Sequence, residues 1–196
     1  MLISVQQTTK IPLRSIDLSW DCGCATRAIL KIALFSFCLN HSFVTAQDTL
    51  NNITPLVGST LKAQPFKLID VNNKLHQLSD YKGKILIVNF WASWCTPCLE
   101  EIPAMNRAYM QLRDKNVAML AINFGEDKET VNQFLKKYPI DFDVLLDESS
   151  AMSKDWKINA LPTTVIINPR SEVIDTLLGS REWDSEEIIA AVLSIK

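Results

Sequence analysis

The chain has 196 residues, a formal net charge of −2 and 47% hydrophobic residues. This length and composition suffice for one domain with a proper hydrophobic core and for a further segment. The nearly balanced charge gives no sign of a nucleic-acid partner, and we expect none. The sequence contains no internal repeats and no low-complexity tracts.

The further segment lies at the N-terminus. Residues 27–39 form an apolar run with basic flanks, and Val44 and Ala46 place small residues where a signal peptidase reads them. We therefore predict a leader over residues 1–46, with a signal peptide cleaved after Ala46, and a periplasmic or otherwise extracytoplasmic protein. A retained membrane anchor is the weaker alternative, because the run contains Lys31, breaks at Asn40 and is shorter than the roughly 20 residues that cross a bilayer. Residues 47–61 are polar without a sustained period and are predicted to be a linker to a domain over 62–196.

The cysteine count changes when the leader is removed. The leader holds Cys22, Cys24 and Cys38, so only Cys95 and Cys98 remain in the domain. An exported protein that uses disulfides for structure carries more cysteines than two. We therefore expect these two thiols to serve redox chemistry in an oxidising compartment.

Strand and helix patterns alternate along the predicted domain. The run 85–91 is β-branched and aromatic with almost no charge, which suits a central strand buried on both faces. His76 lies in a short strand pattern and is expected to face solvent. Strands that alternate with helices, followed by an antiparallel hairpin, predict an α/β fold with a mixed sheet between helical layers. The predicted strands are 66–70, 74–78, 85–91, 117–124, 142–147, 160–168 and 172–178, and the predicted helices are the one that follows Cys98, 126–138, 150–156 and 184–195.

Cys95 and Cys98 lie where the central strand ends and a helix begins. The unpaired N–H groups and the dipole of a helix N-terminus favour an anion, here a thiolate. Thiols in such positions have pKa values lowered from about 8.5 to about 3.5–7.5. Cys95 is therefore the predicted nucleophile, and Cys98, one turn further into the helix, is the predicted resolving thiol. Pro97 suits this early helical position, because its missing N–H is not needed there and its fixed φ helps hold the sulfurs close.

A zinc site is the alternative for two cysteines at this spacing. It requires two further Cys or His ligands, and no Cys or His follows Cys98. We therefore expect no metal, and no cofactor other than a redox-active Cys95–Cys98 disulfide.

Two motifs and the order of the elements resemble a known family. The motifs are Trp94-Cys95-Thr96-Pro97-Cys98 and Leu161-Pro162-Thr163-Thr164. They resemble those of proteins with the thioredoxin fold, and among these the exported TlpA/ResA-like thiol-disulfide oxidoreductases. The resemblance covers roughly residues 61–196 and implies a TlpA-type insertion between residues 141 and 156. The strand patterns 66–70 and 74–78, joined by an Asn-rich turn, predict an N-terminal β-hairpin. The resemblance also implies that Pro162 is a cis-proline packed against the dithiol. Substrate contacts are expected from Trp94, Thr96, Pro97 and the backbone of Leu161.

The chain departs from ordinary thioredoxins beneath the dithiol. Thioredoxins carry a buried aspartate where this chain has Asn89, so that proton acceptor is absent. Glu101 resembles the glutamate that lies three residues after the second cysteine in TlpA/ResA-like proteins, and we predict that it accepts the proton of Cys98. The alternative is a solvent-exposed helix glutamate, as we expect for Glu100. Pro103 is expected to kink the helix.

The resemblance implies a reductant of protein disulfides, and we expect it to act as a monomer. Reduced Cys95 attacks a disulfide of a partner protein, Cys98 resolves the mixed disulfide, and an inner-membrane electron donor recharges the protein. Apocytochrome c, with its haem-attachment cysteines, is the first substrate to test. The alternatives are a disulfide-forming oxidant on the same fold, a peroxide-reducing enzyme, which the paired cysteines disfavour, and a copper-binding assembly factor that holds a soft metal between the cysteines.

Overall fold

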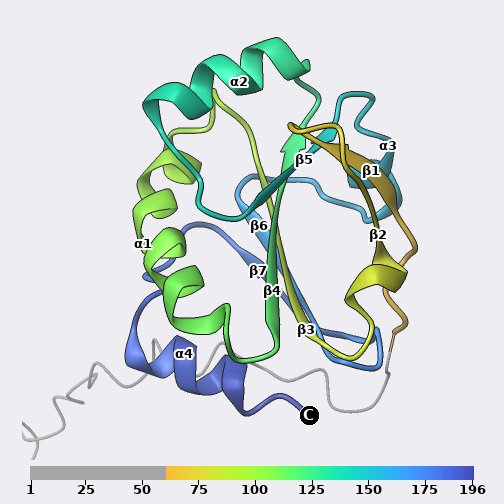
Figure 1. Ribbon diagram of the computed structural model, residues 1–196, viewed down its shortest axis with the longest axis vertical. Coiled ribbons are helices and arrows are strands. Elements are labelled where there is room, and N and C mark those ends of the chain that lie inside the picture. Colours follow the sequence, from red (N-terminus) through yellow and green to blue (C-terminus); the bar gives the residue numbers. More distant parts are fainter. Residues whose placement is uncertain (1–60) are drawn as a thin grey trace, which may run out of the picture. The chain divides into compact units, whose positions relative to one another are not determined.

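A computed structural model describes residues 61–196, which form a seven-stranded sheet with helices on both faces (Figure 1). The predicted leader and the predicted linker up to residue 60 lie outside the described residues. Among residues 61–196, no helix combines the length and the apolarity needed to cross a bilayer.

The sheet is mixed, as predicted. Its strand order is β2-β1-β5-β4-β3-β6-β7. The pairs β3/β4 and β4/β5 are parallel, and all other neighbours are antiparallel. All seven residues of β3 are buried, which confirms the predicted central strand. The strands are β1 (Lys67–Asp70), β2 (Leu75–Gln77), β3 (Ile85–Trp91), β4 (Val117–Phe124), β5 (Asp143–Asp147), β6 (Thr163–Ile167) and β7 (Val173–Leu178).

The helices begin where side chains satisfy their first N–H groups. The Asp127 side chain accepts the N–H of Thr130 at the start of α2, and the Ser185 side chain accepts the N–H of Ile188 at the start of α4. Helices α2 and α4 therefore begin two residues later than predicted. The helices are α1 (Thr96–Leu112), α2 (Lys128–Lys137), α3 (Ala151–Asp155) and α4 (Glu186–Leu193), with a 3₁₀ helix η1 (Leu78–Tyr81).

Alternate residues of β3 enter two different cores. Ile85, Ile87 and Trp91 pack with α1, α2 and α4, whereas Val88 and Phe90 pack with α3 on the other face. Figure 1 shows α1 and α4 on one side of the sheet and α3 on the other. A strand with apolar residues on both faces is the pattern that its uncharged sequence predicted.

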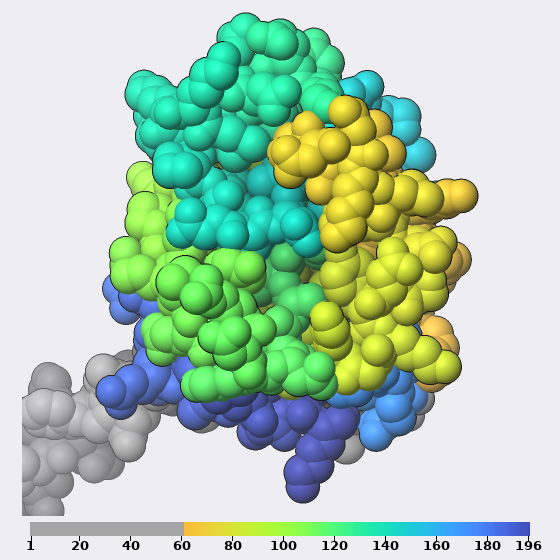
Figure 2. Space-filling view, in the orientation of Figure 1, coloured from red at the N-terminus to blue at the C-terminus, as the bar shows by residue number. Residues whose placement is uncertain are grey.

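The expectation that His76 faces solvent is wrong. Its side chain is 2% exposed, its Nε2 lies 3.2 Å from Asp70 Oδ2, and its Nδ1 bonds the hydroxyl of Tyr81. The alternation of the short strand does not show that the following 3₁₀ helix returns over it and covers it. A neighbouring hollow has a volume of about 380 Å³, and Tyr109 and Phe142 also line it. Figure 2 shows this hollow between α1 (green) and the β2–η1 segment (yellow).

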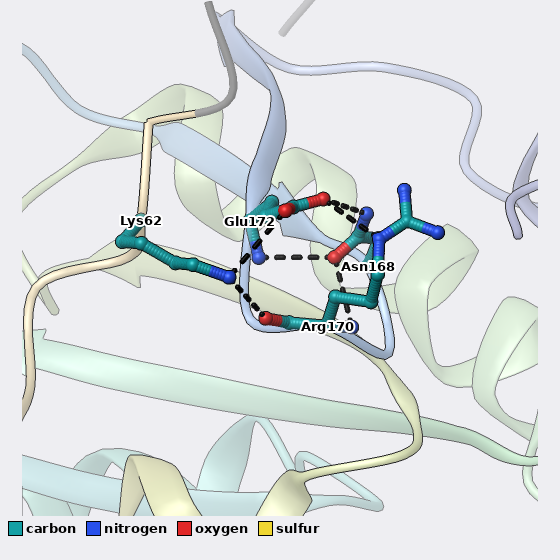
Figure 3. A network of polar contacts seen from close by, with 4 residues as sticks. All are labelled: Lys62, Asn168, Arg170 and Glu172. Atoms are coloured by element: carbon teal, nitrogen blue, oxygen red, sulfur yellow. Dashed lines mark hydrogen bonds and ion pairs between the residues drawn. The ribbon is translucent and has the colours of Figure 1, made fainter.

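A polar network joins the start of the described chain to the turn between β6 and β7 (Figure 3). Lys62 Nζ lies 3.4 Å from Glu172 Oε1 and donates to the carbonyl oxygen of Arg170 at 3.1 Å. Hydrogen bonds from Asn168 and Arg170 to Glu172 lower the pKa of this carboxyl to about 2. The N–H of Gly83, just ahead of β3, donates to the carbonyl of Pro169 in the same turn. The network therefore lies at the end of the sheet where β3 begins.

Candidate active site

The two cysteines lie at the opposite end of β3, in the first turn of α1. Cys95 is the N-cap residue, and its Sγ accepts the N–H of Cys98 at 3.3 Å. The two residues form a disulfide with a Cα–Cα distance of 5.3 Å. Both are buried, Cys98 more completely than Cys95. The Cys98 N–H also donates to the carbonyl oxygen of Cys95 at 3.0 Å, so the first turn of the helix directs a shared donor at the sulfur that is predicted to carry the thiolate.

Three of the predicted substrate-contact residues adjoin the cysteines in the chain and are exposed. Trp94 is 66% exposed, and Thr96 and Pro97 are also exposed. The Leu161–Pro162 peptide bond is cis, as the resemblance implies. Thr163, the next residue, pairs with Phe90 near the end of β3, so Pro162 lies beside the segment that leads to Cys95.

A pocket of about 300 Å³ connects these residues. Trp94 and Leu161 both line it, together with Phe124, Ile158 and Ala160. None of its lining residues carries a charge. Trp94 and Leu161, two predicted contact residues that are 67 positions apart in the sequence, thus lie at the same apolar pocket.

Glu101 is buried, not solvent-exposed. Its side chain lies on α1, one turn after Cys98, and is 2% exposed, whereas Glu100 is exposed. Oε1 accepts Nδ2 of Asn89 at 2.8 Å, and Oε2 accepts Nε1 of Trp183 at 2.9 Å. Burial raises the pKa of Glu101, and the hydrogen bonds from Trp183 and Asn89 offset part of this shift. A buried carboxyl whose pKa is raised is suited to accepting a proton, so the predicted role remains open to test.

Asn89 takes a different role from the aspartate that thioredoxins carry at this position. Its Nδ2 donates both to Glu101 and to Thr164 Oγ1, the latter at 3.0 Å. Since Thr164 lies opposite Asn89 in the β3/β6 register, the amide is held from two sides. Asn89 therefore fixes the carboxylate of Glu101 and does not itself titrate.

Sequence reasoning missed Trp183, which lies between β7 and α4. It is separated from Glu101 by 82 positions, and a lone tryptophan ahead of a helix carries no signal for such a contact. The structure shows the indole to be 1% exposed and bonded to the carboxylate. It is the second side chain that holds Glu101.

Glu126 was also missed. Its carboxylate accepts the N–H of Ser93 at 2.8 Å, the hydroxyl of Ser93, and Nδ2 of Asn123 at 2.7 Å. Asn123 in turn accepts the N–H of Glu126. This contact ties the segment between β3 and Cys95 to the end of β4, so it holds the approach to the nucleophile.

One group of described residues has the composition of a metal site. Ligand atoms of Asp70, His76 and Asp143 all lie within 4.8 Å of one another. Both ring nitrogens of His76 already have partners, Tyr81 and Asp70, so the group forms a satisfied polar network. At the dithiol, Cys95 and Cys98 are joined to each other, and neither His nor a further Cys occurs from residue 77 onward apart from this pair.

Comparisons with known proteins agree with this geometry. The model of the AhpC/TSA family matches residues 60–176, which include both cysteines and Pro162. The thiol-disulfide oxidoreductase ResA of Geobacillus kaustophilus is 36% identical over 168 residues, covering 86% of this chain and 91% of the relative. ResA of Bacillus subtilis is 39% identical over 118 residues, covering 60% of this chain and 66% of that protein. A crystal structure of a putative thiol:disulfide interchange protein DsbE from Chlorobium tepidum has a TM-score of 0.64 at 28% identity, covering 70% of this chain and 99% of that chain.

Proposed function

The chain belongs to the AhpC/TSA family and is a thiol-disulfide oxidoreductase with a thioredoxin-like fold, and from this premise we propose that it reduces disulfides of partner proteins outside the cytoplasm. The similarity to ResA supports a substrate that is a disulfide-bearing protein. The predicted signal peptide supports the extracytoplasmic location.

The reaction transfers two electrons from the dithiol to the substrate. The Cys95 thiolate attacks one sulfur of the substrate disulfide, a Cys95–S bond forms, the substrate S–S bond breaks, and the first substrate thiolate leaves and takes a proton from water. Cys98 then gives its proton to Glu101 and attacks the Cys95 sulfur. The Cys95–Cys98 bond forms, the bond from Cys95 to the substrate breaks, and the second substrate thiolate leaves. The protein ends in the oxidised form that this structure contains.

The observation that carries the direction is the buried carboxyl of Glu101 behind the dithiol. Oxidants of this fold are strong because the reduced form, with its thiolate, is stabilised. An ionised carboxylate within the same protein interior disfavours a second negative charge nearby. The Glu101 carboxyl therefore destabilises the thiolate of the reduced form and favours donation of electrons.

The substrate and the electron donor form the finer part of the proposal. A reductant in an oxidising compartment needs a dedicated substrate and a dedicated supply of electrons. Apocytochrome c is the proposed substrate, because its haem-attachment cysteines must be reduced before haem is joined to them. A dithiol protein of the inner membrane is the proposed electron donor, and the protein is proposed to act as a monomer.

The reduction potential of the Cys95–Cys98 couple tests the direction. The purified protein is equilibrated with glutathione or dithiothreitol buffers, and its thiols are then quantified. A value near or below about −270 mV, that of thioredoxin, supports the reductant, and a value near about −120 mV makes the protein a disulfide donor. Absence of a couple together with stoichiometric copper binding that blocks thiol labelling would favour the copper-binding alternative.

A further inference from the structure

The indole of Trp183 is fixed by apolar packing on the sheet side of α4. It belongs to the same buried cluster as Ile166 of β6, Leu177 of β7 and Val192 of α4. Only the N–H is polar, and it donates to Glu101 Oε2 at 2.9 Å. Because the ring is 1% exposed and packs with side chains of two strands and a helix, the position of this donor is set by the fold.

The carboxylate of Glu101 is held on both oxygens. Asn89 binds Oε1 from β3, and Trp183 binds Oε2 from the segment after β7. A carboxylate has about four acceptor positions, so these two donors leave room for a proton. The two donors favour the ionised form, and Cys98 lies one turn away on the same helix.

We propose that Trp183 is a positioning residue for disulfide closure: its N–H holds the Glu101 carboxylate in place and ionised, and thereby sets the pH range in which Cys98 can be deprotonated. The inference rests on the proposed function, because it requires Glu101 to be the proton acceptor. The proton passes from the Cys98 thiol to a Glu101 oxygen. The Cys98 sulfur then bonds Cys95, and the electron pair of the broken bond leaves on the substrate sulfur.

Charged groups around Glu101 come from two elements. Arg181 and Glu182 lie on the segment after β7, and Glu100 lies on α1. The positive charge of Arg181 opposes the effect of burial on Glu101. From β3, only the neutral amide of Asn89 faces the carboxylate. Since Arg181 and Trp183 are two positions apart, one segment provides both the cation and the indole donor.

A second opening borders Glu101. It has a volume of about 310 Å³ and is lined by Glu100, Glu101, Ser180, Arg181 and Glu182. None of these residues lines the pocket beside Trp94. A substrate bound in the pocket beside Trp94 therefore leaves this second opening uncovered.

Two-phase thiol release tests the inference. In the full chain with Cys22, Cys24 and Cys38 replaced by serine, the reduced protein is mixed with Ellman's reagent and followed at 412 nm between about pH 5 and pH 9, a range around the pKa values of the groups involved. The first release reports attack by Cys95, and the second reports attack by Cys98 on the mixed disulfide.

The Trp183→Phe variant keeps a ring in the apolar site and removes the N–H. Its first phase should change far less than its second phase, because the proton that Glu101 accepts comes from Cys98. The ionised acceptor loses one charge-assisted hydrogen bond in this variant. The acid limb of the second phase, which is the range of pH in which its rate falls on acidification, should therefore move up by about one pH unit. The second phase at pH 6 then slows roughly tenfold. The sign follows because a weaker hydrogen bond to the carboxylate leaves it protonated up to a higher pH.

Two further variants interpret the result. Trp156→Phe removes an indole N–H that has no hydrogen-bond partner among residues 61–196. The ring packs against the core on the other face of the sheet, so this variant should leave both phases unchanged. Glu101→Gln cannot titrate and should abolish the acid limb that Glu101 causes. If Trp183→Phe loses the first phase through misfolding, 3-benzothienylalanine at position 183 replaces it, because it keeps the bicyclic shape and exchanges the N–H for sulfur.

The outcomes separate the two levels of the proposal. If Glu101→Gln retains the parent profile, Glu101 is not the proton acceptor, and both the proton step of the proposed function and the inference are overturned. If Glu101→Gln removes the limb but the position-183 variant follows Trp156→Phe, only the inference is overturned. A selective shift of the second phase in the position-183 variant supports it.

Discussion

Replacing Glu126 by alanine should loosen the segment that leads into Cys95. The carboxylate accepts two hydrogen bonds from Ser93 and one from Asn123, and these join the end of β3 to the end of β4. Ser93 is partly accessible, so water can replace its partner after the substitution. Asn123 is fully buried, and its amide would lose the acceptor without replacement.

The expected loss is about 3 kcal/mol of unfolding free energy. A hydrogen bond to a charged group contributes roughly 1.5–3 kcal/mol, and a buried donor left unpaired costs about 1–3 kcal/mol. The two contributions are not independent, and solvent reduces the share of Ser93, so the sum of three full bonds is too large. For a domain of this size, about 3 kcal/mol corresponds to roughly 10 °C in Tm.

Urea unfolding of Glu126→Ala and Glu129→Ala provides the measurement and its control. Glu129 is an exposed residue in the first turn of α2, and its side chain accepts a hydrogen bond from Gln133 at 3.0 Å. Its removal changes the net charge equally and should cost less than about 1 kcal/mol. Equal losses for the two variants would refute the reasoning, because the cost would then come from charge and not from the contact with Ser93 and Asn123.

Three further changes have defined outcomes. Cys98→Ser should trap a mixed disulfide between Cys95 and its substrate, visible as a reductant-sensitive band on a gel, and loss of the band in the additional Cys95→Ser background checks that Cys95 is the nucleophile. Burial raises the pKa of Glu101 above its unfolded value, so the folded state loses stability as pH rises from about 4.3 through the folded pKa. Glu101→Gln removes this loss, and in urea unfolding it should gain stability relative to the parent protein between about pH 4 and pH 7. A stability difference that does not change with pH would contradict this. Gly125→Ala places a Cβ 2.8 Å from a serine hydroxyl at φ +72°, whereas Gly179→Ala at φ +80° meets no atom within 4 Å; calorimetry should show a loss of about 1–2 kcal/mol at Gly179 and a larger loss at Gly125.

The elements that carry the dithiol could be predicted because their signals are local. The uncharged run of β3 and the cysteine spacing occupy 14 consecutive positions, from Ile85 to Cys98, and the structure confirms the strand, the helix and their junction. The burial of Glu101 could be anticipated only as one of two readings of its position on the helix. The structure decides between them, because Asn89 and Trp183 bind both of its oxygens.

The missed contacts all depend on residues that meet only after folding. Ser93 and Glu126 are 33 positions apart, and Glu101 and Trp183 are 82 apart. The alternation along the short strand shows that His76 lies on one face and its neighbours on the other. Which of the two faces is covered depends on the path of η1, whose Tyr81 packs over His76. Periodicity reports which residues share a face, and it does not report what packs against that face.

The polar network of Lys62 has a mechanical consequence. It joins the start of the described chain to the turn beside the beginning of β3, whereas Cys95 follows the end of β3. A seven-residue strand spans about 20 Å, so the two features lie at opposite poles of the sheet. If the protein is attached to a sensor surface or a force probe through a residue before Lys62, the attachment point lies at the end of the sheet remote from the dithiol. The end of the sheet that carries Cys95 and Cys98 then faces the solution.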